Sequence, residues 1–418
     1  MRHGVAIVEY DCFSSAGLSL EASWDRLADN QSGIGPITRY EVEAQTLQGL
    51  PAIAYGGQIP QTFEELAGSS AQFNRWPEPS FHAIKALTKI ILGRLDFDIS
   101  HHDPQRIAML GGTVFTGEFP RDLLSRTQRA DSKFLLSQCH NIPMAAAASD
   151  FGLQGPSYSI GGACASSGHA LLLATQLMQC DLIDCALVFG YEFPLVPLTI
   201  GSLTWVNALY KKDLPGDRGY DDPTQASRPF SKDRRGFVPA EGVGGVFMSR
   251  PDYARQRGWP IKGMILGGYA NSDASHLTRL AQDNVAVCMK RALEAAGCNR
   301  EDIDCINAHA TSTPYGDRAE MTALAEVFGE HLGQIPIVAN KSQIGHSVAA
   351  ASILELMLAV EGMRRNVVLP TLNYMHDPDL PKAMIPTEAL EYSHHVTLSS
   401  SFGFGGTNVA LVVAAATG

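Results

Sequence analysis

The sequence lacks the features that mark several large classes of protein. Its apolar runs fall well short of the roughly 20 residues that a membrane-spanning helix needs, and the run that starts at Val5 is too brief for a signal peptide. Its eight cysteines stand singly, without a CxxC pair or zinc-ribbon spacing, so neither a disulfide framework nor a structural zinc site is expected. We therefore expect a cytoplasmic protein with reduced thiols and no attachment to a membrane.

Positive charge is also scarce. The 418 residues include 32 Lys and Arg against 43 Asp and Glu, which gives a formal net charge of −11. Nucleic-acid-binding proteins usually carry a basic excess, so DNA or RNA binding is disfavoured. The composition otherwise suits a globular protein, which excludes collagen-like, coiled-coil and largely disordered chains. Neither a dinucleotide fingerprint nor a Walker-type phosphate loop occurs, and no cofactor is expected.

Apolar strands alternate with helix-length segments along the whole chain, which is typical of an α/β sandwich. The best boundary is the polar segment 250–260, broken by proline and glycine, which divides the chain into residues 1–257 and 258–418. Segments 155–178 and 335–360 follow one plan: a short strand, a glycine-bearing turn, a reactive side chain and an Ala/Leu-rich helix. The two halves are therefore predicted to repeat one design and to bring both helix starts together.

Cys164 stands at the predicted start of the first of these helices, directly after Gly161 and Gly162. The N–H groups of a helix's first turn carry partial positive charge, which stabilises a thiolate. We therefore expect the pKa of Cys164 to fall below the value of roughly 8.5 for a free thiol and the residue to act as a nucleophile. Taken alone, a cysteine here is as often a small buried apolar side chain, and both interpretations stay open.

Two histidines favour the interpretation of Cys164 as a nucleophile. His309 follows the predicted strand 303–306, at the strand end where ligands collect in α/β proteins. His346 precedes the second helix, whose dipole disfavours a protonated ring. Neutral imidazoles can donate hydrogen bonds to an oxyanion, so these rings and Cys164 predict one active site. The glycine-rich turn at 401–408 is expected to present backbone N–H groups to the same oxyanion.

Together these segments resemble the β-ketoacyl-ACP synthases, nearest to the synthase I/II branch with its Cys-His-His triad. The resemblance covers essentially the whole chain. It rests on five motifs in the expected order, namely ACASS at 163–167, ASRPFSKDRRGF at 226–237, AHATSTP at 308–314, NKSQIGHS at 340–347 and SFGFGGTN at 401–408.

The resemblance implies a thiolase-like α/β fold, a duplicated five-layer α-β-α-β-α sandwich that is normally a homodimer. The N-terminal half would carry the nucleophile, and the C-terminal half would carry both histidines. Cys164 would accept an acyl chain from a carrier thioester. His309 and His346 would then support decarboxylation of a malonyl thioester, and the resulting carbanion would attack the acyl group.

The resemblance also implies supporting residues. Lys341 and Glu320 would form a charged pair near the histidines. Phe404 would separate the two steps as a gate, and its backbone N–H would join that of Cys164 in holding the oxyanion. Residues 109–116 would border the acyl tunnel, which Phe115 would shorten if its ring pointed inward.

The implied partner is an acyl carrier protein in its acyl and malonyl forms. Such carriers are acidic, so a chain with a net charge of −11 needs a local basic patch for docking. Arg126, Arg129 and Lys133 form one candidate patch, and Lys211 with Lys212 forms another.

Several departures from the family pattern leave the acyl substrate and the pathway open. Gly161 and Gly162 stand where the family has a polar pair, Ala310 replaces a glycine, and residues 9–14 replace a Thr-Gly-x-Gly pattern. Fatty-acid and polyketide-type chains are both compatible with the motifs. Two alternatives remain: an acyltransferase or thiolase-like enzyme that passes the acyl group elsewhere, and a non-extending partner subunit that shapes product length. The presence of the cysteine and both histidines argues against the partner subunit.

Overall fold

The computed structural model describes residues 4–39, 53–69, 71–72, 76–115, 135–136, 138–206, 208–214 and 217–416. Its main strands form two units of five. The strand order in the first unit is β5 (Ser157–Ile160), β4 (Ile107–Gly112), β6 (Cys185–Glu192), β9 (Gly242–Ser249) and β1 (Val5–Ser14). The order in the second unit is β12 (Ile337–Val338), β11 (Cys305–Asn307), β15 (Val396–Gly403), β16 (Thr407–Ala415) and β10 (Gly263–Ser272).

The two units also agree in strand direction. In the first, β4 runs parallel to β5 and β6, whereas β9 is antiparallel to β6 and β1. In the second, β11 runs parallel to β12 and β15, whereas β16 is antiparallel to β15 and β10. This equivalence confirms the predicted duplication. The units join where Val5 of β1 pairs antiparallel with Ile265 of β10, so hydrogen bonds connect all ten strands into one continuous sheet.

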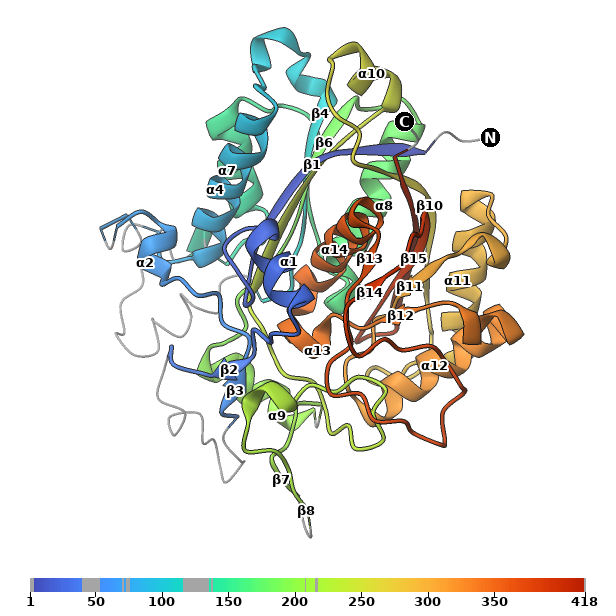
Figure 1. The fold of residues 1–418 in the computed structure, drawn as a ribbon. Helices are drawn as coiled ribbons and strands as arrows, with labels where there is room; N and C mark the ends of the chain where they lie inside the picture. The colour runs from blue at the N-terminus through green and yellow to red at the C-terminus, as the bar shows by residue number, and fades with distance from the viewer. Residues whose placement is uncertain are drawn as a thin grey trace.

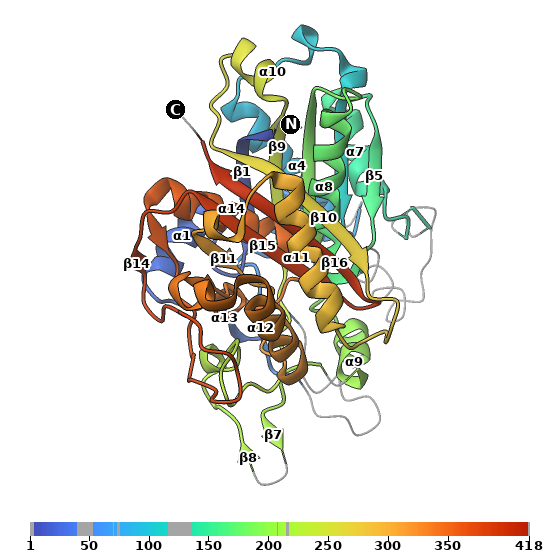
Figure 2. The ribbon, with the colours of Figure 1, turned by 90° about the vertical axis from the view of Figure 1, so that its right-hand side faces the viewer.

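Helices cover both faces of each unit, which gives the five layers of the expected sandwich (Figure 1). The middle layer consists of α8 (Ser166–Gln179) and α14 (Ala351–Arg365), which contact each other and strands of both units. The outer helices are α4 (Pro79–Arg94) and α7 (Ile142–Phe151) on one side, and α11 (Gln282–Ala296) and α12 (Pro314–Phe328) on the other (Figure 2).

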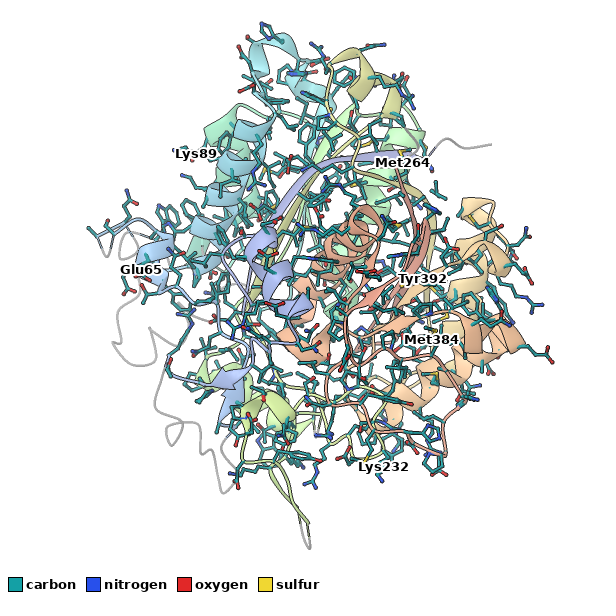
Figure 3. The ribbon with its side chains drawn as sticks, in the orientation of Figure 1. Glu65, Lys89, Lys232, Met264, Met384 and Tyr392 are labelled. Carbon is teal, nitrogen blue, oxygen red and sulfur yellow. The ribbon has the colours of Figure 1, made fainter. Side chains whose placement is uncertain are left out.

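Burial explains this arrangement. Every residue of β1, β6 and β9 is buried, as expected for strands with helices on both faces. Most of α14 is buried as well, because it lies between the two units. The outer helix α4 buries one face only and exposes Lys89 at the edge of the molecule (Figure 3). No helix in the described part of the chain is both long enough and apolar enough to cross a bilayer.

Shorter elements complete the fold. The other α-helices within the described residues are α1 (Leu20–Ala28), α2 (Phe63–Leu66), α9 (Pro197–Trp205), α10 (Pro251–Gln256) and α13 (Lys341–Ile344). The two-stranded pairs are β2 (Gly35–Pro36) with β3 (Tyr55–Gly56), β7 (Asp213–Leu214) with β8 (Asp217–Arg218), and β13 (Val367–Val368) with β14 (Leu390–Glu391). The polar segment 250–260 contains α10, which starts at a proline and is followed by Gly258 with a φ of +69°.

Candidate active site

Cys164, His309 and His346 converge although up to 182 positions separate them in the chain. Cys164 lies in the 3₁₀ turn η4 (Ala163–Ala165) before α8, His309 follows β11, and His346 follows α13. The distance from Nε2 of His346 to Sγ of Cys164 is 3.0 Å, and the ligand atoms of all three side chains lie within 4.8 Å of one another. The two imidazole rings meet edge to face, with centroids 5.4 Å apart. The predicted cluster is therefore present.

Unusual backbone conformations flank the cluster. Ala163, Ala310 and Val348 have φ values of +47°, +26° and +45°, in the region that side chains with a Cβ normally avoid. Each such residue costs on the order of 1–3 kcal/mol, which surrounding contacts must hold in place. At the nucleophile, Ser166 Oγ accepts a hydrogen bond from Gly162 N at 2.8 Å and donates one to Ala163 O at 2.7 Å. These bonds fix the turn that directs Cys164 toward the histidines.

The turn between β15 and β16 packs directly on this nucleophile turn. Thr407 Oγ1 donates a hydrogen bond to Gly162 O at 2.8 Å. A Cβ atom on Gly403 would lie 2.5 Å from the same carbonyl oxygen, so only glycine permits the contact. The backbone N–H of Phe404, like that of Cys164 itself, consequently reaches Sγ of Cys164 and lowers its pKa. The two N–H groups expected for an oxyanion thus lie beside the sulfur.

The thiol is nevertheless weakly acidic. Burial raises the pKa of Cys164 to about 12, because desolvation of a thiolate outweighs the lowering by the Lys341 charge and the two N–H groups. The low pKa expected from the helix start is therefore wrong. A helix terminus stabilises an anion only modestly, whereas a side chain that is 8% exposed loses most of its hydration. The resting sulfur is a thiol, and it needs a neighbouring base.

Both imidazoles are neutral, as expected, but for another reason than the helix dipole. Burial lowers the pKa of His309 and of His346 well below the usual value, and the positive charge of Lys341 lowers both further. The second middle-layer helix starts only at Ala351, after the 3₁₀ turn η8 (Val348–Ala350), so His346 lies outside its first turn. A neutral His346 can accept the thiol proton.

The charged residues near the histidines are arranged differently from the expected pair. Lys341 forms its ion pair with Glu355 of α14, and both side chains are buried. Glu320 instead accepts hydrogen bonds from the backbone N–H groups of His309 and Ala310, each at 2.7 Å. Burial raises the pKa of Glu320 to about 8 and that of Glu355 to about 7. Glu355 is not among the predicted site residues, although a lone carboxylate in the apolar run 353–358 was a signal for it.

The motif at 226–237 connects the two halves around the site. Ser227 Oγ donates to Lys341 O at 2.7 Å, and Phe230 N donates to a carboxylate oxygen of Asp317 at 2.7 Å. Phe237, at the end of the motif, packs edge to face on His346 with ring centroids 5.1 Å apart. The motif therefore positions the histidine loops and shapes the wall beside His346.

A cavity of about 300 Å³ connects Cys164 to the surface. His309, His346 and Phe404 line its inner part, and the loop 276–280 lines its outer part. Phe115 does not line this cavity. It borders a separate space of about 10 Å³ beside Glu78 and Glu192, and its N–H donates to Glu192 Oε1 at 2.9 Å.

The structure describes only one of the two docking patches expected from the sequence. Arg126, Arg129 and Lys133 lie outside the described residues. Lys212 forms an ion pair with Asp221 at 2.6 Å, so its charge is partly neutralised.

The same cluster could also bind a metal ion, because a thiolate and two imidazole nitrogens are the donors that zinc prefers. Its chemistry without a metal is already clear from the geometry. A buried thiol, a neutral base and paired N–H groups at the end of one channel make up the site of an acyl-transferring enzyme with a thiolase-like fold.

Comparison with known proteins agrees with this class. The chain matches the family model "Beta-ketoacyl synthase, N-terminal domain" over residues 2–254 and "Beta-ketoacyl synthase, C-terminal domain" over residues 262–375. It is 33% identical to a chloroplastic 3-oxoacyl-[acyl-carrier-protein] synthase I of Arabidopsis thaliana, covering 97% of this chain and 85% of the relative. It is 29% identical to a 3-oxoacyl-[acyl-carrier-protein] synthase 2 of Coxiella burnetii, covering 99% and 98%.

A solved structure gives the same result. A type II polyketide synthase acyl-carrier protein in complex with its ketosynthase, bound to a hexaketide, matches with a TM-score of 0.87 at 25% identity over all of both chains. The chain belongs to the β-ketoacyl synthase family, whose members are acyltransferases.

Proposed function

We propose that the protein catalyses decarboxylative condensation: it extends an acyl group held on Cys164 by two carbons taken from malonyl-ACP. The observation that carries the proposal is the 3.0 Å contact between Cys164 Sγ and His346 Nε2, with His309 in the same cavity. The product is a β-ketoacyl-ACP of a fatty-acid or polyketide-type pathway, and carbon dioxide is released.

The first step transfers the acyl group. Sγ of Cys164 attacks the thioester carbon while its proton passes to His346 Nε2. The backbone N–H groups of Cys164 and Phe404 hold the tetrahedral oxyanion. The bond to the carrier sulfur then breaks, and the carrier thiolate takes the proton from His346. The thiol is far less acidic than a buried imidazolium, so proton transfer accompanies the attack rather than preceding it.

The second step forms the carbon–carbon bond. The neutral ring of His309 donates a hydrogen bond to the malonyl thioester oxygen as carbon dioxide leaves, and His346 donates a second one in the tautomer that carries its single proton on Nε2. The enolate carbon attacks the acyl carbon on Cys164, and the carbon–sulfur bond breaks. The released thiolate takes a proton from solvent, so one proton is consumed for each carbon dioxide released. Lys341 and Glu320 support this step by keeping the rings neutral and by holding the His309 backbone. Phe404, next to the sulfur, separates the two steps.

We further propose a cytoplasmic homodimer that binds acyl carrier proteins, with halves at 1–257 and 258–418. The eight cysteines are all free, which supports a reducing compartment. Strand β5 stands at an end of the ten-stranded sheet, and its Tyr158 is half exposed. An edge strand of this kind favours pairing with a second copy.

The test uses acyl-ACP and malonyl-ACP with the purified protein and follows carbon dioxide and product mass. The wild type should add one two-carbon unit, and Cys164→Ala should not extend the chain. Cys180→Ala, at an exposed position, is the matched control and should extend normally. Extension by Cys164→Ala would disprove the assignment of the nucleophile, and acyl transfer by the wild type without carbon dioxide would favour the acyltransferase alternative.

A further inference from the structure

Glu192 is a buried carboxyl near Cys164 that does not line the active-site cavity. It is the last residue of β6, and its side chain is only 2% exposed. Burial raises the pKa of Glu192 to about 8, although the backbone N–H groups that bind its carboxyl act in the opposite direction. Removing a carboxyl from water costs free energy, so these hydrogen bonds are what keep Glu192 in this position.

The carboxyl of Glu192 connects two segments from opposite halves of the chain. Val114 N donates to Oε2 at 3.0 Å and Phe115 N donates to Oε1 at 2.9 Å, and both residues follow β4 closely. The N–H of Ala349, which lies in η8, is a third donor to the same carboxyl. Hydrogen bonds to a carboxylate are short and strong, so Glu192 fixes η8 relative to the end of β4.

The segment η8 is the link to the catalytic histidine. It begins two residues after His346, and its first residue, Val348, has a φ of +45° that surrounding contacts must hold. It packs against β6 and against η4, which carries Cys164. A displacement of η8 would therefore change the 3.0 Å separation between His346 Nε2 and Cys164 Sγ.

The charge of Glu192 does not favour the reaction. Burial is the largest cause of the raised pKa of Cys164, Lys341 lowers this pKa, and the negative charge of Glu192 raises it further. An ionised Glu192 therefore opposes loss of the thiol proton. If the carboxyl of Glu192 assists acylation, it does so through the hydrogen bonds that it accepts.

We propose that Glu192 is a positioning residue, which holds η8 against the end of β4 and thereby keeps His346 in hydrogen-bonding reach of the Cys164 thiol. This inference rests on the proposed function, because it assigns Glu192 a part in acylation through the general base. It distinguishes Glu192 from Glu320, which binds the backbone of the other histidine, His309.

The test measures single-turnover acylation of Cys164 by an acyl N-acetylcysteamine thioester, followed by intact mass. In Glu192→Gln one oxygen becomes an amide nitrogen, which cannot accept a backbone N–H, so acylation should fall about 10- to 100-fold as His346 is displaced. Loss of the charge alone would lower the pKa of Cys164 and raise the rate, so the direction of the change separates positioning from electrostatics. Glu361→Gln replaces another buried carboxyl, near the far end of α14, and as the matched control should acylate normally.

A double-mutant cycle shows whether Glu192 acts through His346. In a His346→Gln background, Glu192→Gln should lower acylation by less than about twofold, because the base that it positions is already absent. An equal loss in both backgrounds, or an unchanged or faster rate in Glu192→Gln alone, would overturn the proposal. If Glu192→Gln does not fold, Glu192→Asp, which keeps the carboxyl but shortens its reach, replaces it in the same cycle. A wild type that is not acylated would refute the proposed function, whereas either contrary result with an acylated wild type refutes this inference alone.

Discussion

The two five-stranded units share one plan but contribute differently to the site. The first presents Cys164 on a tight turn that leads directly into α8. The second presents both histidines. It also supplies the ion pair between Lys341 and Glu355. The first unit thus supplies the position of a weakly acidic sulfur, and the second supplies the base and the charge that keeps it neutral. A duplicated fold can divide a reaction between its copies in this way.

The contribution of the second unit is tested most directly by replacing His346, the proposed general base. His346→Gln keeps a polar side chain but cannot accept a proton, so acylation of Cys164 should fall about 10²- to 10⁴-fold. Single-turnover acylation followed by intact mass measures this loss. His395→Gln, an exposed histidine, is the control. A loss below about tenfold would mean that His346 is not the base.

The positive charge near the two histidines can be removed by replacing Lys341. Lys341→Met leaves Glu355 buried without its partner, and the free energy of unfolding should fall by about 3–5 kcal/mol. Chemical denaturation measures the change. Lys290→Met breaks the half-exposed pair with Glu326 and should cost only about 0–1 kcal/mol. Equal losses in the two variants would show that burial of the Lys341 pair is unimportant.

The weak acidity of the sulfur can be tested through its reaction with iodoacetamide. Because the pKa of Cys164 is about 12, the thiolate fraction below that pH rises tenfold per pH unit. Alkylation of Cys164 should therefore accelerate about 100-fold between pH 7 and pH 9. Peptide mass mapping follows the site, with Cys164→Ala as the background. A rate that is already flat at pH 7 would contradict a thiol in the resting state.

The smallest expected effect concerns the backbone of the histidine loop. Ala310 has a φ of +26°, and the resemblance places a glycine there. Ala310→Gly removes strain but loosens the unfolded chain, so stability should change by no more than about 1 kcal/mol and activity should persist. Ala308→Gly, without a positive φ, should lose more stability. The opposite order in thermal denaturation would argue against strain at Ala310.

Much of the site could be predicted because each motif is local. The local backbone at a glycine turn before a helix, or at a histidine after a strand, is determined by residues adjacent in the sequence. The duplicated fold then brings Cys164, His309 and His346 together. The acidity of the thiol could not be predicted, because it depends on desolvation by distant parts of the chain. The partner of Lys341 was missed for the same reason: Glu355 reaches it from α14, 14 positions away.

The pairing of Val5–Ile7 with Gly263–Ile265 has a consequence for any attempt to divide the protein. Cutting the chain between the halves would uncover the edges at which β1 and β10 pair, and it would leave the sulfur on one fragment and both imidazoles on the other. Exposed strand edges promote aggregation. Gene splitting or separate expression of the pieces should therefore yield insoluble, inactive material unless the two fragments are produced together and reassemble.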